Sequence, residues 1–222
     1  MTETVSNQII LMDVRIDRVS LTKPFIGQDA PIDPATGQKV GKYHVDCILP
    51  PDHPQLPAFQ QLMREAVVRK FKDEAAVVLE QIRANNKFPL HRGDVDRAGK
   101  AQYAGMLYIS ANNDEQPTIV VTENGVNIAN RGTPVVLTPS HPLYPYPGCY
   151  ANVQLSVYGY SHPKGGKGVA AQVMGVQFNR HGQRLMGAQV SSASEFGLVA
   201  QQADGAPPTP ALAAAGGGTG LI

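Results

Sequence analysis

The 222-residue sequence lacks features that mark several common classes of protein. It has no tryptophan and only two cysteines, Cys47 and Cys149, which lie far apart in strand-like surroundings. Such a pair favours buried thiols in a reducing compartment over a disulfide framework. No apolar run is long enough to cross a membrane, and residues 1–8 lack the basic start and apolar stretch of a secretory signal. We therefore expect a cytoplasmic protein without a membrane partner.

Acidic residues are missing from a long internal segment. Residues 124–194 contain five Lys or Arg and no Asp or Glu, although the net charge of the whole chain is only +1. If these cations share a face, that face carries an uncompensated positive potential, which suits a polyanion such as nucleic acid. The alternative is that five widely spaced cations only aid solubility.

Catalytic and metal-binding motifs are absent as well. The stretch "KGGKGV" resembles a phosphate-binding loop, but Ser161 replaces the first glycine of that motif and Gly168 replaces its magnesium-binding hydroxyl. None of the six histidines lies at a ligand spacing from another histidine or a cysteine. Asp94 and Asp96 are flanked by arginines, which is more typical of a salt-bridged loop than of a metal site. We predict a protein that is not an enzyme and that needs no metal or cofactor.

What the sequence does contain is a series of alternating apolar and polar segments, the pattern of half-buried β-strands. In the first, residues 9–21, the alternation puts Ile10, Met12, Val14 and Ile16 on one face. Further strands are expected at residues 42–49, 102–113, 117–128, 150–160 and 169–178. The segment 117–128 is expected to be a hairpin, because Asn124-Gly125 suits a type I′ turn.

One segment has strong helical periodicity. It runs from Pro57 to Asn85-Asn86, and a break is expected near Lys72-Asp73.

The pattern as a whole predicts a mainly β protein: a small barrel of five or six strands like the oligonucleotide-binding (OB) fold, with one long helix inserted after the second strand. Residues 1–190 would form this domain. Residues 191–222, rich in Ala, Gly and Pro and nearly uncharged, would form a flexible tail.

Outward-facing tyrosines suggest how such a barrel could hold single-stranded nucleic acid, which is bound by cations at phosphates and by aromatic rings at bases. In the strand 150–160, Val153, Leu155 and Val157 would face the core while Tyr158 and Tyr160 face outward. Tyr108 is outward on its own strand. The stacking candidates are therefore Tyr108, Tyr158 and Tyr160, and the phosphate-binding candidates are Lys42, Arg92, Lys100, Arg131, Lys164 and Lys167. The alternative is that these tyrosines pack under the helix or a loop, since Tyr is common in strands.

The order of four segments resembles a known family. These segments are "GKYHVDCILPPDHPQLPAFQQLMREAV", "KFPLHRGD", "YAGMLYISANN" and "YPGCYANVQLSVYGYSHPKGGKGVAAQVMGVQF". They are similar to phage and prophage single-stranded DNA-binding proteins with an OB fold and, more distantly, to the helix-destabilising proteins of short-tailed coliphages. The resemblance covers residues 9–187. It implies a non-enzymatic protein of the host cytoplasm that coats and protects single strands during DNA replication or recombination, with phage replication proteins and further copies of itself as candidate partners.

One feature of that family is missing here. Its members commonly end in an acidic tail with a terminal aromatic residue, whereas this chain ends in "ALAAAGGGTGLI". The resemblance therefore does not extend to recruitment of partners by the tail. A different class stays open on the residues alone: a phage structural or assembly protein would use the same outward tyrosines as anchors of a protein interface.

Overall fold

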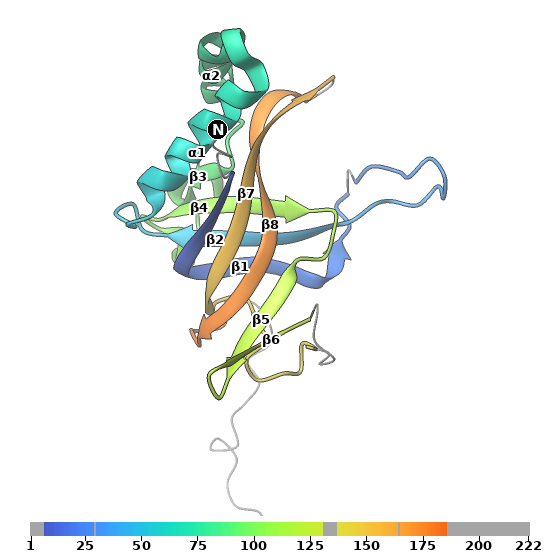
Figure 1. Ribbon diagram of the computed structural model, residues 1–222, viewed down its shortest axis with the longest axis vertical. Helices are drawn as coiled ribbons and strands as arrows, with labels where there is room; N and C mark the ends of the chain where they lie inside the picture. Colours follow the sequence, from blue (N-terminus) through green and yellow to red (C-terminus); the bar gives the residue numbers. More distant parts are fainter. Residues whose placement is uncertain (1–6, 29, 131–136, 164, 186–222) are drawn as a thin grey trace, which may run out of the picture. The chain divides into compact units, whose positions relative to one another are not determined.

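The computed structural model describes residues 7–28, 30–130, 137–163 and 165–185, and Figure 1 traces them. The strands are β1 (Gln8–Phe25), β2 (Lys42–Leu49), β3 (Leu90–Arg92), β4 (Leu107–Asn113), β5 (Thr118–Glu123), β6 (Val126–Ala129), β7 (Tyr150–His162) and β8 (Gly166–Arg180). The helical elements are α1 (Leu56–Phe71), η1 (Lys72–Glu74), α2 (Ala75–Ala84), α3 (Gly93–Asp96) and η2 (Ala101–Tyr103). The tail predicted for residues 191–222 lies outside the described residues.

Five of these strands close into a barrel. The described part of the chain forms one sheet in the order β3-β4-β2-β1-β7-β8-β5-β6, and an additional parallel pairing joins β4 to β8. That pairing closes the ring β4-β2-β1-β7-β8, whose other neighbours are all antiparallel. The helices follow the second barrel strand. The predicted OB-like barrel with an inserted helix is therefore confirmed, and β5 and β6 extend the sheet from β8 outside the ring.

The first strand corrects one detail of the sequence pattern. Ile10 and Met12, predicted to face the core, are 49% and 50% exposed, whereas Leu11 is fully buried. The cause is a β-bulge at Asp13, which has φ +53° and lies where the pairing with β7 shifts register. Because a bulge adds one residue, it reverses which side chains face inward. Beyond it, Val14 is buried as predicted.

The helical segment breaks where the sequence predicted. Lys72 has φ +46°, and a single turn of 3-10 helix separates α1 from α2 at that point. Pro57 lies in the first turn of α1, where its missing N–H costs no hydrogen bond. One face of the two helices is buried against the barrel, through Phe59, Met63, Ala66, Val67, Val78 and Ile82.

The hairpin of β7 and β8 rises beside these helices (Figure 1). Val153, Leu155 and Val157 are fully buried in the core, as predicted. Gly159 continues the inward side of β7 and meets α1 directly. A Cβ at this position would lie 2.8 Å from the Cβ of Lys70 and 2.9 Å from the carbonyl oxygen of Ala66. The tip of the hairpin is therefore held against the helix through backbone contact.

Two smaller predictions are also confirmed. Asn124 and Gly125 have φ values of +50° and +77°, as a type I′ turn between β5 and β6 requires. Cys47 and Cys149 are free and fully buried. Burial raises the pKa of the Cys149 thiol to about 11, which leaves it protonated and unreactive at neutral pH.

Candidate nucleic-acid interface

OB barrels bind oligonucleotides on the outer face of their second and third strands and with the loops that join strands one to two and four to five. In this chain those strands are β2 and β4, and the loops are residues 26–41 and 163–165. The outward side chains of β2 and β4 face each other in register as the pairs His44 and Asn112, Asp46 and Ser110, and Ile48 and Tyr108. The outer face of β2 and β4 is therefore the candidate binding surface.

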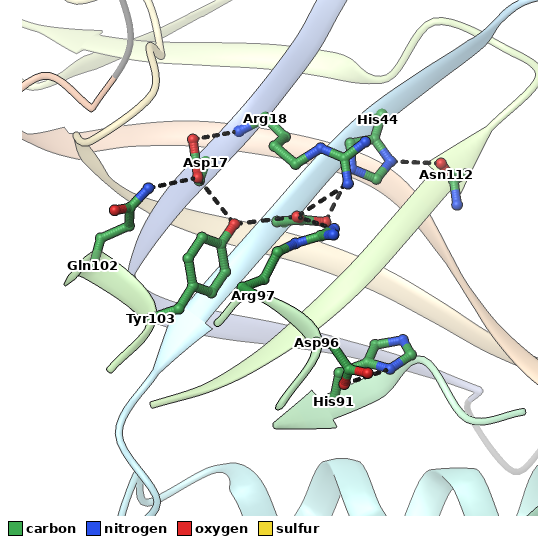
Figure 2. A network of polar contacts seen from close by, with 10 residues as sticks. Asp17, Arg18, His44, His91, Asp96, Arg97, Gln102, Tyr103 and Asn112 are labelled. Atoms are coloured by element: carbon green, nitrogen blue, oxygen red, sulfur yellow. Dashed lines mark hydrogen bonds and ion pairs between the residues drawn. The ribbon is translucent and has the colours of Figure 1, made fainter. Parts of the chain in front are cut away.

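Two buried carboxylates organise the polar groups there (Figure 2). The Asp46 carboxylate, which is fully buried, lies 2.9 Å from Nε2 of His44 and 3.2 Å from Nη2 of Arg97. The Asp17 carboxylate on β1 accepts a hydrogen bond from the Tyr103 hydroxyl at 2.9 Å. That hydroxyl also lies 3.2 Å from Asp46, so it connects the two carboxylates. The result is one network that ties β1, β2 and the segment after β3 together.

The charges of this network are fixed by its own contacts. Burial alone would raise the pKa of Asp46, but the hydrogen bond from His44 and the charges of His44, Arg18 and Arg97 outweigh it and hold this pKa below its ordinary value. Asp46 is therefore a carboxylate at neutral pH. Burial and the nearby carboxylates raise the pKa of Tyr103, so its hydroxyl remains a donor.

A second bulge in β1 brings Arg18 into this surface. Arg18 has φ +49°, and the pairing of β1 with β2 shifts register between Asp17 and Ser20. Its Nη1 lies 3.9 Å from the Asp46 carboxylate, and 37% of its side chain remains exposed. Beside it runs a groove of about 240 Å³, lined by Arg18, Val19, Phe25, His44 and Pro147. Phe25 is 60% exposed, so this groove combines a cation with an accessible aromatic ring.

Tyr108 does not fit the predicted role. It lies away from the main core, as the alternation indicated, but it is only 3% exposed. Its ring stacks on His91 at a centroid distance of 4.9 Å, meets Tyr103 edge-on at 5.2 Å and lies 5.0 Å from the Arg97 guanidinium. The segment after β3 covers it, which strand periodicity could not reveal. No face of this ring is accessible to a base in this structure.

The two candidate tyrosines of the β7–β8 hairpin, Tyr158 and Tyr160, differ in their exposure to solvent. Tyr158, opposite Ala170 on β8, is 44% exposed and offers a ring surface. Tyr160 is half-buried and lies across Gly168, where a Cβ would come 2.4 Å from its Cζ atom. Of the two, Tyr158 is the better placed to stack on a base.

The predicted cations do not form one patch. Lys42 pairs with Asp114 at 3.2 Å, beside one end of β4, whereas Arg92 lies opposite Leu107 at the other end. Lys100 is exposed in the loop before η2. Lys167, at the hairpin tip, pairs with Glu74 at 2.7 Å. Arg131 and Lys164 lie outside the described residues.

The hairpin tip has a cationic groove of its own, of about 520 Å³, between α2 and the turn from β7 to β8. Its lining consists of Gln81, Asn85, Lys87, Gly165, Gly166 and Lys167. Lys87 was not among the predicted contacts, because no sequence pattern indicates that the end of α2 lies beside this turn.

The part of the chain that the structure describes contains no cluster of three or more His, Cys, Asp or Glu residues placed to hold a metal ion. None of its helices is both long enough and apolar enough to cross a membrane.

The sequence of the chain matches one family model and one curated relative. The family model described as the Enterobacter phage Enc34 ssDNA-binding protein matches residues 8–206. A curated relative, "Putative protein p50" of Acyrthosiphon pisum secondary endosymbiont phage 1, is 29% identical over 188 residues, which cover 83% of this chain and 92% of the relative.

Two solved structures share the fold. The ssDNA-binding protein of bacteriophage Enc34 in complex with ssDNA matches with a TM-score of 0.55 at 19% identity, covering 81% of this chain and 90% of that one. A C-terminal truncation of the Enc34 protein matches with a TM-score of 0.53, also at 19% identity, covering 80% of this chain and 88% of that one.

Proposed function

Because the chain belongs to the family of the Enterobacter phage Enc34 single-stranded DNA-binding protein, we propose that it coats single-stranded DNA with little sequence preference and protects it during phage DNA replication or recombination. The observation that carries this proposal is the family match across residues 8–206. A solved relative holds single-stranded DNA on the same fold. The role is binding rather than catalysis.

The outer face of β2 and β4, with the adjoining groove of Arg18 and Phe25, supports this function best. Arg18 and Arg97 are anchored by the buried Asp46 carboxylate while parts of their side chains stay exposed, at 37% and 22%. Anchored guanidinium groups lose little rotamer freedom when they bind phosphate. The exposed Phe25 ring can stack on any base, which accounts for binding without sequence preference.

The hairpin of β7 and β8 would extend the path of the strand. Tyr158 supplies a stacking surface, and the half-buried Tyr160 lies beside it. Lys167 and Lys87 line a groove that can hold a phosphate. The strands connect the two surfaces: β8 pairs with β4 through Ala171 and Ala111, and β4 pairs with β2. Strands in a sheet lie about 5 Å apart, so the two surfaces are within reach of one bound strand. Lys42, Arg92 and Lys100 would contact phosphates at the rim.

Titration of a labelled oligo-dT, followed by fluorescence anisotropy, tests the function. We expect tight binding at low salt. The logarithm of the affinity should fall linearly with the logarithm of the salt concentration, with a slope of about 0.7 for each phosphate contact in a single strand. A duplex of the same length should bind more weakly. Absence of binding to the single strand at low salt would contradict the proposal. Equal affinity for single strand and duplex would mean that the protein attracts polyanions in general and has no preference for single-stranded DNA.

A further inference from the structure

A larger cleft continues from the groove of Arg18 and Phe25. It has a volume of about 610 Å³ and lies between residues 19–23 of β1 and residues 139–147, with Arg184 at its rim. The cleft and the groove share Val19 and Pro147. Sites that hold small organic ligands have volumes of about 300–1,000 Å³, so this one has room for a nucleotide.

The wall opposite β1 is held in place before any ligand binds. It contains four prolines, each with a fixed φ, at positions 139, 142, 145 and 147. The Gly148 N–H, just after this segment, donates to the Ile16 carbonyl of β1 at 2.7 Å, and the Leu185 N–H, in the chain that follows β8, donates to the Pro147 carbonyl at 3.0 Å. The cleft therefore does not have to be assembled by its ligand.

A cation is fixed at the rim. The Arg184 guanidinium lies 4.2 Å above the Tyr146 ring, and the Tyr146 hydroxyl donates a hydrogen bond to the Gly182 carbonyl at 2.9 Å. A guanidinium stacked on one side keeps its edge and its other face free for a phosphate or a base. Lys23 lines the same cleft and is exposed. No acidic residue lines either the cleft or the groove among the described residues.

A buried polar group also lines the cleft. Tyr144 is 8% exposed, and its hydroxyl lies beside Thr22 without a hydrogen bond of ordinary geometry among the described residues. A buried hydroxyl without such a bond favours a ligand that supplies a partner.

We propose that this cleft is a second nucleotide-binding site, which takes the next nucleotides of the strand bound on the outer face of β2 and β4. Arg184 and Lys23 contact phosphate, and the Tyr144 hydroxyl bonds to a base or sugar. This inference rests on the proposed function. The cleft lengthens the DNA track, so its contribution depends on the length of the oligonucleotide.

The test compares oligo-dT of about 6 and about 16 nucleotides, which span the site sizes of OB folds. The double variant Lys23→Ala/Arg184→Ala should bind the longer strand about tenfold more weakly than the unmodified protein, because two charged contacts to phosphate are lost. It should bind the shorter strand equally well. The matched control is Arg64→Ala/Arg69→Ala, which removes the same charge from the exposed side of α1 and should change neither affinity by as much.

Each outcome decides a different point. If the unmodified protein binds neither strand, the proposed function itself is wrong. If it binds both and the cleft variant matches it at both lengths, only the cleft assignment is overturned. Tyr144→Phe should weaken binding of the longer strand while the melting temperature of the free protein stays unchanged or rises, because the fold loses no hydrogen bond. A lowered melting temperature with unchanged affinity would give the hydroxyl a purely structural role. Saturable binding of dTMP that leaves bound oligo-dT in place would also overturn the inference, because the cleft would then hold free nucleotide.

Discussion

The Tyr160 ring lies across Gly168 on the neighbouring strand, so closely that a Cβ on Gly168 would come 2.4 Å from the ring's Cζ atom. The two residues are directly opposite in the pairing of β7 with β8. Glycine is needed here for the space it leaves and not for an unusual backbone angle. The ring covers backbone that would otherwise face solvent at the hairpin tip.

Gly168→Ala should therefore destabilise the fold by about 1–3 kcal/mol, because the added methyl group forces the ring aside. Urea unfolding measures the change. Adding Tyr160→Ala should remove most of this cost, so the two substitutions would not be additive. Gly27→Ala is the control, since its Cβ would meet Phe25 at an ordinary 3.8 Å. Additive effects of the two hairpin substitutions would contradict the contact.

Tyr158→Ala should weaken binding of oligo-dT about tenfold, as expected for the loss of one stacked base, and leave stability nearly unchanged because the ring is 44% exposed. Tyr158→Phe keeps the aromatic face and should bind normally. Tyr108→Ala provides the contrast: its ring is 3% exposed, so this change should cost about 3 kcal/mol of stability. Anisotropy and thermal unfolding of the three variants distinguish the roles. A Tyr158→Ala protein with normal affinity would exclude this ring from the interface.

Periodicity predicted the barrel because its strands have one buried side, and it placed Val153, Leu155 and Val157 correctly. It failed where a bulge added a residue, as at Asp13, because a bulge changes the phase without changing the local composition. A strand pattern also shows only which side of the sheet a residue faces. Tyr108 faces away from the main core but lies under Arg97 and Tyr103 of the segment just before its strand, and alternation within a strand does not show how a preceding loop folds back over it.

The same limit explains why the arrangement of the cations could not be predicted. The sequence shows which residues are lysines and arginines, but it does not show which acidic residues they pair with. Arg18 and Arg97 converge on Asp46 from positions far apart in the chain, and Asp46 itself looks like an ordinary polar residue in an alternating strand. The groove beside Phe25 was missed because β1 runs to Phe25, beyond the point where its alternating pattern ends.

The stability of the protein should depend on the Asp46 carboxylate. Its pKa is depressed in the folded state, so the stabilisation is complete above the unfolded value of about 3.9 and is lost as the pH falls through the lower folded value. Burial lowers the pKa of His91, so stability should also fall on acidification below about pH 6.5. Urea unfolding at stepped pH would show two separate declines. Asp46→Asn should lower stability by about 3 kcal/mol at neutral pH and remove the more acidic decline. If Asp46→Asn still loses stability at the more acidic step, that step must come from other carboxylates.

Arg18→Ala should reduce both the affinity for oligo-dT and its dependence on salt. The guanidinium stands 3.9 Å from Asp46 with 37% of its side chain exposed, so it can contact a phosphate without leaving the network. Loss of one phosphate contact should lower the slope of the logarithm of affinity against the logarithm of salt concentration by about 0.7. Arg18→Lys should restore the slope, since the charge returns, but only part of the affinity, because lysine lacks the planar fork that binds phosphate through two hydrogen bonds. Arg69→Ala, an exposed cation on α1, should leave the slope unchanged. An Arg18→Ala protein with the slope of the unmodified chain would mean that the strand does not pass over this groove.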